Sequence, residues 1–248
     1  MMRGRFLTLC FAVLAMVPAA CATSMTTTTQ SPLRDARQLV VVTVPGWTSV
    51  DGKMRRFERD SNADSWREVG VATAIVVGRT GLAWGRGLHP DVTGGPVKRE
   101  GDGKAPAGIF TMGTAFGFAD QLATRLPYLT LDGRTECVDD SESRFYNQIV
   151  DRQQAVPVDW SSSEKMRTID QYRMGVVVNH NTPAEGGRGS CIFLHLWGNA
   201  TIGTAGCTAM ASESMSGLLG WLDPAHRPLV VQLPTSEYDR LKKSWSLP

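Results

Sequence analysis

The residues best suited to chemistry in this sequence are His195 and Cys207. They flank a run of Gly, Asn, Thr and Ala in the stretch FLHLWGNATIGTAGCTAM, residues 193–210. A thiol at its ordinary pKa is only a few per cent thiolate at neutral pH, so a catalytic cysteine needs a neighbouring base or a favourable field. His195 can supply that base. The alternatives are a hydrogen-bonded core histidine and a thiol that is buried or disulfide-bonded.

Gly206, directly before Cys207, adds a second indication. A residue without a Cβ permits a tight turn and a close approach of substrate, and the main-chain N–H groups of such a turn can hold an oxyanion. Nucleophile, base and oxyanion donors together are the requirements of acyl transfer. A metal site is less well supported, because His195 and Cys207 give two ligands and no Cys-x-x-Cys or His-x-x-x-His spacing supplies the others.

The N-terminus has the features of a secretory signal peptide. Arg3 and Arg5 precede the apolar run FLTLCFAVLAMV and the small-residue stretch PAACA. The apolar run is shorter than the roughly 20 residues that a membrane span needs. Cleavage after Ala22 would release a soluble protein, whereas cleavage before Cys21 would leave that thiol for a lipid anchor. Both outcomes place the protein outside the cytoplasm, in the periplasm or on a membrane of the bacterial envelope.

Cysteine usage bears on the nucleophile. Loss of Cys10 with the signal leaves Cys21, Cys137, Cys191 and Cys207 in an oxidising compartment. If Cys21 is cleaved off or lipidated, one disulfide and one free thiol remain. We predict the pair Cys137–Cys191, because neither residue lies in a glycine-rich setting that would expose a reactive sulfur. Cys207 is then expected to be free and partly thiolate.

Net charge limits the class of partner. Removal of Arg3 and Arg5 brings the formal charge from +2 to zero, so no basic excess is left to attract nucleic acid or an anionic membrane surface. The substrate must therefore be recognised locally, within the site.

Hydrophobic patterns predict the elements that position these residues. Short β-branched runs bounded by Gly, Pro or Asp indicate strands: LVVVTVPG, ATAIVVG, YLTLDG, MGVVVNH, CIFLHLW and PLVVQLP. Helical periodicity predicts one helix after Cys207, with Ser212 as its N-cap and Pro224 just past its end, and a shorter helix over 236–245. We expect a mainly β fold with a few peripheral helices.

The strand CIFLHLW defines one wall of the candidate site. Alternation places Phe193, His195 and Trp197 on the same face of this strand. The Gly- and Pro-rich segments 88–110 and 181–190 are expected to be long loops of functional importance.

Composition divides the chain into four parts. We expect a signal peptide over 1–22, a polar Thr-rich linker over 23–37, one catalytic domain over 38–234 and a C-terminal helical tail over 235–248. The central part has about 200 residues, enough for one well-buried domain.

Several motifs, taken in order, resemble those of the L,D-transpeptidase catalytic domain, or YkuD-like, family. In that family, a histidine on a strand precedes a Ser/Thr-x-Gly-Cys element. His195 and the run Thr204-Ala205-Gly206-Cys207 are similar to this pattern. The stretch GDGKAPAGIFTMGTAFGF (101–118) resembles another family motif. The segments CVDDSESRFYNQIV (137–150) and GRGSCIFLH (187–195) resemble those of an exported bacterial subgroup. The resemblance extends from about residue 38 to residue 233.

The resemblance implies a mixed β-sandwich or barrel-like domain, acting as a monomer on peptidoglycan in cell wall biogenesis and cell shape. Cys207 would attack the carbonyl at the L-centre of the diamino acid in a tetrapeptide stem and expel the terminal D-alanine. His195 would take the thiol proton. An amine of a second stem would resolve the acyl enzyme into a 3,3 cross-link, and water as acceptor would give an L,D-carboxypeptidase. No metal or organic cofactor is implied.

Two positions depart from the family pattern. Ala205 stands where many relatives carry a second histidine, directly before the Gly-Cys pair. Ala209 stands where they carry an Arg or Asn, two residues after the cysteine. Arg188 is then the best available guanidinium for a stem carboxylate, with Thr204 and Trp197 as further substrate-binding candidates. The alternatives are a cysteine hydrolase of another amide or thioester and a noncatalytic envelope protein that binds peptidoglycan.

Overall fold

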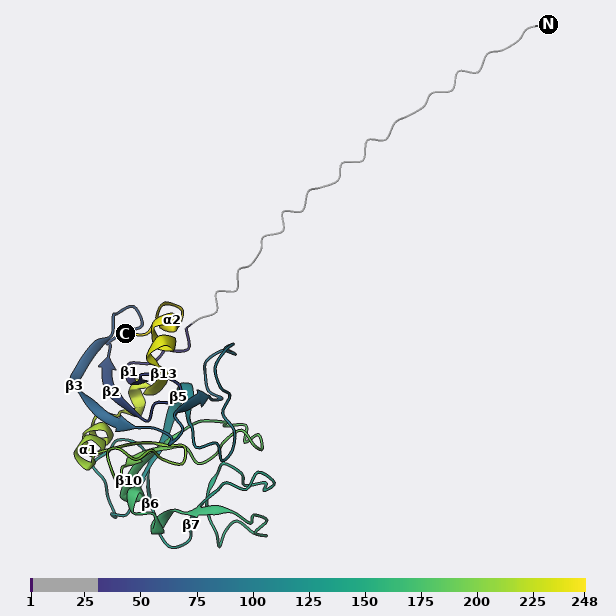
Figure 1. Ribbon diagram of the computed structural model, residues 1–248, viewed down its shortest axis with the longest axis vertical. Helices are drawn as coiled ribbons and strands as arrows, with labels where there is room; N and C mark the ends of the chain where they lie inside the picture. The colour runs from purple at the N-terminus through teal and green to yellow at the C-terminus, as the bar shows by residue number, and fades with distance from the viewer. Residues whose placement is uncertain (2–30) are drawn as a thin grey trace. The chain divides into compact units, whose positions relative to one another are not determined.

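The computed structural model of the protein describes Met1 and residues 31–248, and residues 31–248 form one compact unit (Figure 1). The predicted signal peptide, its cleavage sites and most of the predicted linker lie outside the described residues. None of the helices in the described part of the chain could span a membrane.

Strands dominate the described residues, and they are β1 (Gln38–Val44), β2 (Asp51–Glu58), β3 (Arg67–Val76), β4 (Leu82–Trp84), β5 (Ala105–Gly117), β6 (Tyr128–Thr130), β7 (Thr135–Val138), β8 (Ile149–Asp151), β9 (Ser163–Lys165), β10 (Met174–Val178), β11 (Phe193–Leu196), β12 (Thr208–Met210) and β13 (Leu229–Pro234). The helices are α1 (Ser212–Trp221), α2 (Thr235–Trp245) and the short 3-10 turns η1 (Met166–Thr168), η2 (Asp170–Arg173) and η3 (Pro224–His226).

The main sheet closes into a barrel. Its strands follow the order β10-β11-β12-β3-β2-β1-β13-β5, and β5 pairs in turn with β10. Figure 1 shows β3, β2, β1, β13 and β5 side by side in this order. The sheet is mixed, because β1 pairs in parallel with β13 and β11 pairs in parallel with β12, while neighbouring pairs such as β1–β2 are antiparallel. Closure leaves these strands without free edges. The prediction of a mainly β fold with a few helices is confirmed.

The compact unit is wider than the predicted domain of 38–234. Leu33 and Ala36 are buried in the core, and the Ser31 hydroxyl donates to the Trp245 carbonyl at 2.7 Å. Helix α2 buries Tyr238, Leu241 and Trp245. Residues 31–37 and the C-terminal helix therefore belong to the same unit as the barrel.

Helix α1 is found where it was expected, with a different start. Ser212 is the first helical residue, and Ala211 occupies the N-cap position without a side-chain hydrogen bond. The buried residues Met215, Leu218 and Leu219 attach the helix to the core. Burial of this apolar stripe, more than capping, accounts for the helix.

A second, three-stranded sheet of order β8-β7-β9 was not predicted. Its centre is polar: the Glu136 carboxylate accepts hydrogen bonds from the Ser163 hydroxyl at 2.7 Å, the Trp160 indole at 2.9 Å and Arg152 at 3.0 Å. A sheet held by a buried carboxylate lacks the apolar alternation that reveals a strand in a sequence.

The predicted loop 88–110 is shorter than expected, because β5 begins at Ala105. Pro106 and Gly108, which favoured a loop, are both paired within strands, and Gly108 has a φ of +138°. A Cβ at Gly108 would lie 2.1 Å from the His89 ring, so this glycine allows the ring to pack on the strand.

Candidate active site

Strands β11 and β12 bring the two candidate catalytic residues to one cavity. The strands are parallel neighbours in which His195 pairs with Ala209, and Cys207 directly precedes β12. His195 and Cys207 both line a cavity of about 640 Å³. Ala205 and Ala209 also line it, so the two small side chains leave this part of the cavity open.

Cys207 is the free cysteine of the described residues, and a disulfide joins Cys137 to Cys191. The Cys207 thiol is buried, donates to the Cys191 carbonyl at 3.4 Å and accepts from the Phe193 N–H at 3.3 Å. Cys191 has a φ of +53°, a conformation that side-chain-bearing residues rarely adopt. The Cys207 thiol is thus held by the backbone of the segment that the disulfide fixes.

Thr204 shapes the turn that leads to Cys207. Its hydroxyl donates to the Cys207 carbonyl at 2.6 Å and accepts from the Gly206 N–H at 3.2 Å. The Gly206 N–H is therefore engaged within the turn. A Cβ on Gly206 would lie 3.3 Å from the Lys104 carbonyl, which makes this glycine a point of close approach between two loops. Thr204 and Gly206 both have a structural role in the turn, and both line the cavity.

His195 is held in one tautomer. Its Nδ1 lies 2.7 Å from the Leu196 carbonyl, and because a carbonyl only accepts, Nδ1 carries the proton. The lone pair is then on Nε2, the atom available to act as a base. Burial lowers the pKa of His195 to about 4, opposed by this hydrogen bond. The ring also packs edge-on against Tyr172, with centroids 5.2 Å apart.

The resting site holds neutral partners, in contrast to the expected partial thiolate. Burial raises the pKa of the Cys207 thiol, and the charge of Glu164 raises it further, against the Phe193 N–H and the Tyr172 hydroxyl. With the His195 pKa lowered, the pair at pH 7 is thiol and imidazole. The physical reason is that the same burial disfavours both charged forms.

Sequence patterns missed a second pair in the cavity, Glu164 and Tyr172. The Tyr172 hydroxyl donates to Glu164 Oε2 at 2.7 Å, and both residues line the cavity. Burial raises the pKa of Glu164 to about 7, the Tyr172 hydrogen bond opposes this, and the charges of Asp139 and Glu100 add to it. Glu164 lies in the short strand β9, where it pairs with Cys137.

Replacement of Glu164 by Gln is expected to speed alkylation of Cys207 at pH 8. Glu164 is mostly ionised at that pH, and its negative charge raises the pKa of the thiol. One pKa unit changes the thiolate fraction about tenfold, so we expect an increase of a few-fold to about tenfold. The measurement is the rate of iodoacetamide labelling, followed by mass spectrometry.

The matched control is Glu142→Gln, since Glu142 is exposed and outside the cavity lining. At pH 5.5, Glu164 is protonated in the unmodified protein, and the difference between the two proteins should vanish. Equal labelling rates at pH 8 would contradict the assignment.

The other predicted binding residues divide between cavity and surface. Trp197 lines the cavity with His195. Arg188 does not line it: its Nε lies 4.0 Å from Glu185, and its carbonyl is 3.0 Å from His180 Nε2. The arginine that does line the cavity is Arg79.

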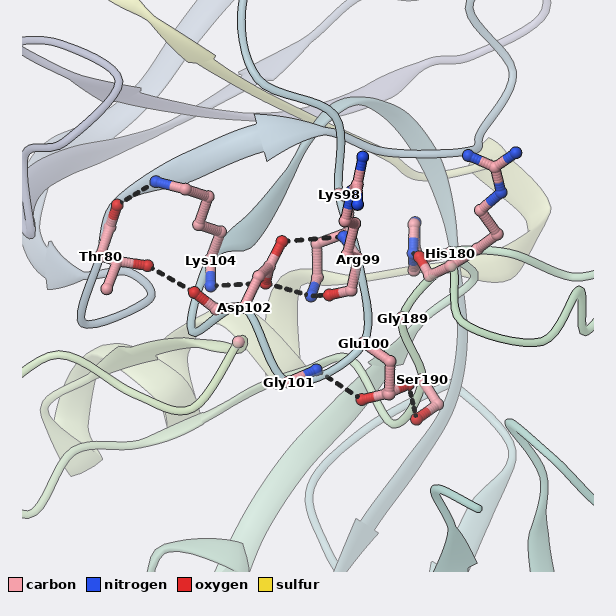
Figure 2. Close-up of polar contacts among 12 residues, drawn as sticks. Thr80, Lys98, Arg99, Glu100, Gly101, Asp102, Lys104, His180, Gly189 and Ser190 are labelled. Atoms are coloured by element: carbon pink, nitrogen blue, oxygen red, sulfur yellow. Dashed lines mark hydrogen bonds and ion pairs between the residues drawn. The ribbon is translucent and has the colours of Figure 1, made fainter. Parts of the chain in front are cut away.

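A charged network supports the loop 98–104 at the edge of the cavity (Figure 2). Lys98 Nζ contacts Asp102 Oδ1 and the Arg99 carbonyl, each at 2.6 Å, and its side chain is 4% exposed. Asp102 also accepts from the Arg99 N–H at 2.8 Å and the Lys104 N–H at 2.9 Å. A single carboxylate thus satisfies a buried ammonium and organises the loop backbone.

Glu100 connects this loop to the segment that holds Cys207. Its Oε2 accepts from the Ser190 hydroxyl at 2.7 Å (Figure 2). The same oxygen accepts from the Tyr146 hydroxyl. Ser190 precedes Cys191, whose carbonyl accepts the Cys207 thiol hydrogen bond. The network therefore fixes the backbone on which the sulfur rests.

No protein-family model, curated protein or solved structure matches the chain.

Proposed function

We propose that this protein is a cysteine acyltransferase acting on peptidoglycan stem peptides, with the chemistry of a YkuD-like L,D-transpeptidase. One observation carries the acyl-transfer part: a free thiol, Cys207, and a histidine with its basic Nε2 available, His195, open from neighbouring strands onto one cavity. The sequence motifs support peptidoglycan as the substrate. The closed mixed barrel is compatible with the barrel-like domain that the motifs imply.

The proposed reaction begins with proton transfer from Cys207 Sγ to His195 Nε2 as substrate binds. The sulfur attacks the carbonyl carbon at the L-centre of the diamino acid, and the main-chain N–H of Cys207 is the donor that we assign to the oxyanion. The C–N bond then breaks, and the imidazolium returns its proton to the departing D-alanine amine. A thioester on Cys207 remains.

The acceptor decides between two products. Attack by an amine of a second stem gives a 3,3 cross-link, whereas attack by water gives a tripeptide; both regenerate the thiol. Three carboxyl groups, those of Glu100, Asp139 and Glu164, line the cavity. These carboxyl groups can accept hydrogen bonds from an approaching amine or ammonium group, and this supports the transpeptidase.

The disulfide supports an exported protein. Cys137 and Cys191 are bonded, and such bonds persist in oxidising compartments such as the periplasm. We therefore propose a location in the bacterial cell envelope, either soluble or anchored through Cys21.

Incubation of the mature protein with disaccharide-tetrapeptide fragments tests the proposal. Products and intact protein would be read by mass spectrometry, with peptide mapping of the acyl adduct. An adduct on Cys207 with cross-linked dimers would support the transpeptidase, and an adduct with tripeptide alone the carboxypeptidase. Turnover only of unrelated amides or thioesters would indicate another cysteine hydrolase. Binding without adduct or product would favour the noncatalytic envelope protein.

A further inference from the structure

We infer that Arg79 binds the free C-terminal carboxylate of the acyl donor and so selects peptides whose last residue is not amidated. This inference rests on the proposed function and assigns a specificity residue to the same cavity. The carboxylate belongs to the amino acid that leaves.

The backbone of Arg79 is fixed beside the nucleophile turn, residues 204–207. Its N–H donates to the Thr204 carbonyl at 2.8 Å, and the preceding Gly78 forms a parallel bridge with Thr204. A Cβ on Gly203 would lie 2.5 Å from Arg79 Cα, so the two segments are in direct contact. Thr204 begins the turn that ends at Cys207.

The other side of the same segment is attached to the loop 98–104 (Figure 2). The Thr80 N–H donates to the Gly103 carbonyl at 3.0 Å, and the Thr80 hydroxyl donates to the Asp102 carbonyl at 2.7 Å. Lys104 Nζ donates to the Thr80 carbonyl. Arg79 thus starts from a backbone held on both sides, so ligand binding has to order only its side chain.

The Arg79 guanidinium, in contrast to its backbone, has no ion pair or hydrogen bond among the described residues. Two cationic side chains line the cavity, Arg79 and Lys98. The Lys98 ammonium is buried and already bonded to Asp102 and the Arg99 carbonyl. Arg79 is exposed and lies along Gly103, where a Cβ would come within 3.1 Å of its Nε. The cavity therefore offers one free cation to an anionic ligand.

The chemistry of this cation fits a carboxylate. A guanidinium binds a carboxylate through two parallel N–H···O bonds, which a lysine ammonium or an amide ligand cannot reproduce. In an L,D-peptide the terminal carboxylate lies one residue past the scissile bond. A guanidinium anchored beside the nucleophile turn is placed for that group.

The test compares tetrapeptide fragments with a free C-terminal carboxylate and the same fragments with a C-terminal amide. Release of the last residue is measured for the unmodified protein, Arg79→Gln, Arg79→Lys and the control Arg188→Gln, since Arg188 is an arginine outside the cavity lining. Arg79→Gln should lower kcat/KM for the carboxylate about 10- to 100-fold and leave the amide nearly unchanged. Arg79→Lys should recover part of the loss.

Equal loss on both substrates, or no loss with Arg79→Gln, would overturn the inference. Binding to Cys207→Ala protein, with and without Arg79→Gln, gives a second readout that needs no turnover. If the unmodified protein released nothing, the proposed function would fail. If Arg79→Gln weakened binding of the carboxylate fragment but not of the amide fragment, Arg79 would still be supported as the residue that binds the carboxylate. Unchanged binding of the carboxylate fragment would reject that role.

Discussion

A Cys207→Ala protein is expected to keep its fold and to lose acyl transfer by at least about 10⁴-fold, because no other group on the cavity wall can form the thioester. The substitution removes one buried sulfur whose hydrogen bonds are weak, at 3.3 and 3.4 Å. Release of D-alanine from tetrapeptide fragments is the measurement, and the thermal midpoint is the check on folding. Release at the unmodified rate would rule out Cys207 as the nucleophile.

His195→Ala provides a graded comparison for this prediction. Loss of a general base lowers rates by about 10² to 10⁴-fold, so residual release above that of Cys207→Ala is expected. Alkylation of Cys207 should also slow if Nε2 takes the thiol proton. An unchanged alkylation rate would show that His195 does not take the proton of the Cys207 thiol. The double variant should be no slower than Cys207→Ala, because the two residues act as a unit.

Asp102→Ala is expected to destabilise the fold by about 3–5 kcal/mol, because it leaves a buried ammonium without its partner. Lys98 and Asp102 side chains are 4% and 17% exposed, and Asp102 also holds two backbone N–H groups of its loop. For a domain of this size the thermal midpoint should fall by about 10 °C. Denaturant unfolding gives the free energy directly.

Asp35→Ala is the control for this effect. Asp35 pairs with Arg227 at 3.3 Å, but both side chains are more than half exposed, and such a pair contributes about 1 kcal/mol or less. Adding Lys98→Met to Asp102→Ala should recover part of the stability by removing the unpaired charge. If Asp102→Ala and Asp35→Ala lowered the free energy of unfolding equally, the buried pair would contribute no more to stability than the exposed pair.

The sequence predicted those parts of the fold that bury apolar side chains in a regular pattern. The apolar runs around β1, β10, β11 and β13 are all strands, and the stripe of Met215, Leu218 and Leu219 is a helix. The two site residues are also close in sequence, since only residues 197–206 separate the strand of His195 from Cys207. Parallel pairing of β11 and β12 then brings the two residues to one cavity.

Elements held by polar contacts could not be predicted in the same way. Strand β2 carries the charged run DGKMRRFE, and only Met54 and Phe57 in it are buried. Glu164 comes from a three-residue strand, and Tyr172 from a 3-10 turn. Proximity of Arg79 to the turn 204–207 depends on a long-range bridge between its neighbour Gly78 and Thr204. Such contacts join distant segments, and no local pattern encodes them.

The carbonyl that accepts the Cys207 thiol belongs to a residue of the disulfide, Cys191, in a left-handed conformation. That conformation is unfavourable for a residue with a side chain and persists only where its surroundings enforce it. Recombinant protein made in a reducing cytoplasm would lack the cross-link that helps to enforce it. Assays of the purified protein should therefore begin from material oxidised at Cys137 and Cys191, with reduced material compared in parallel.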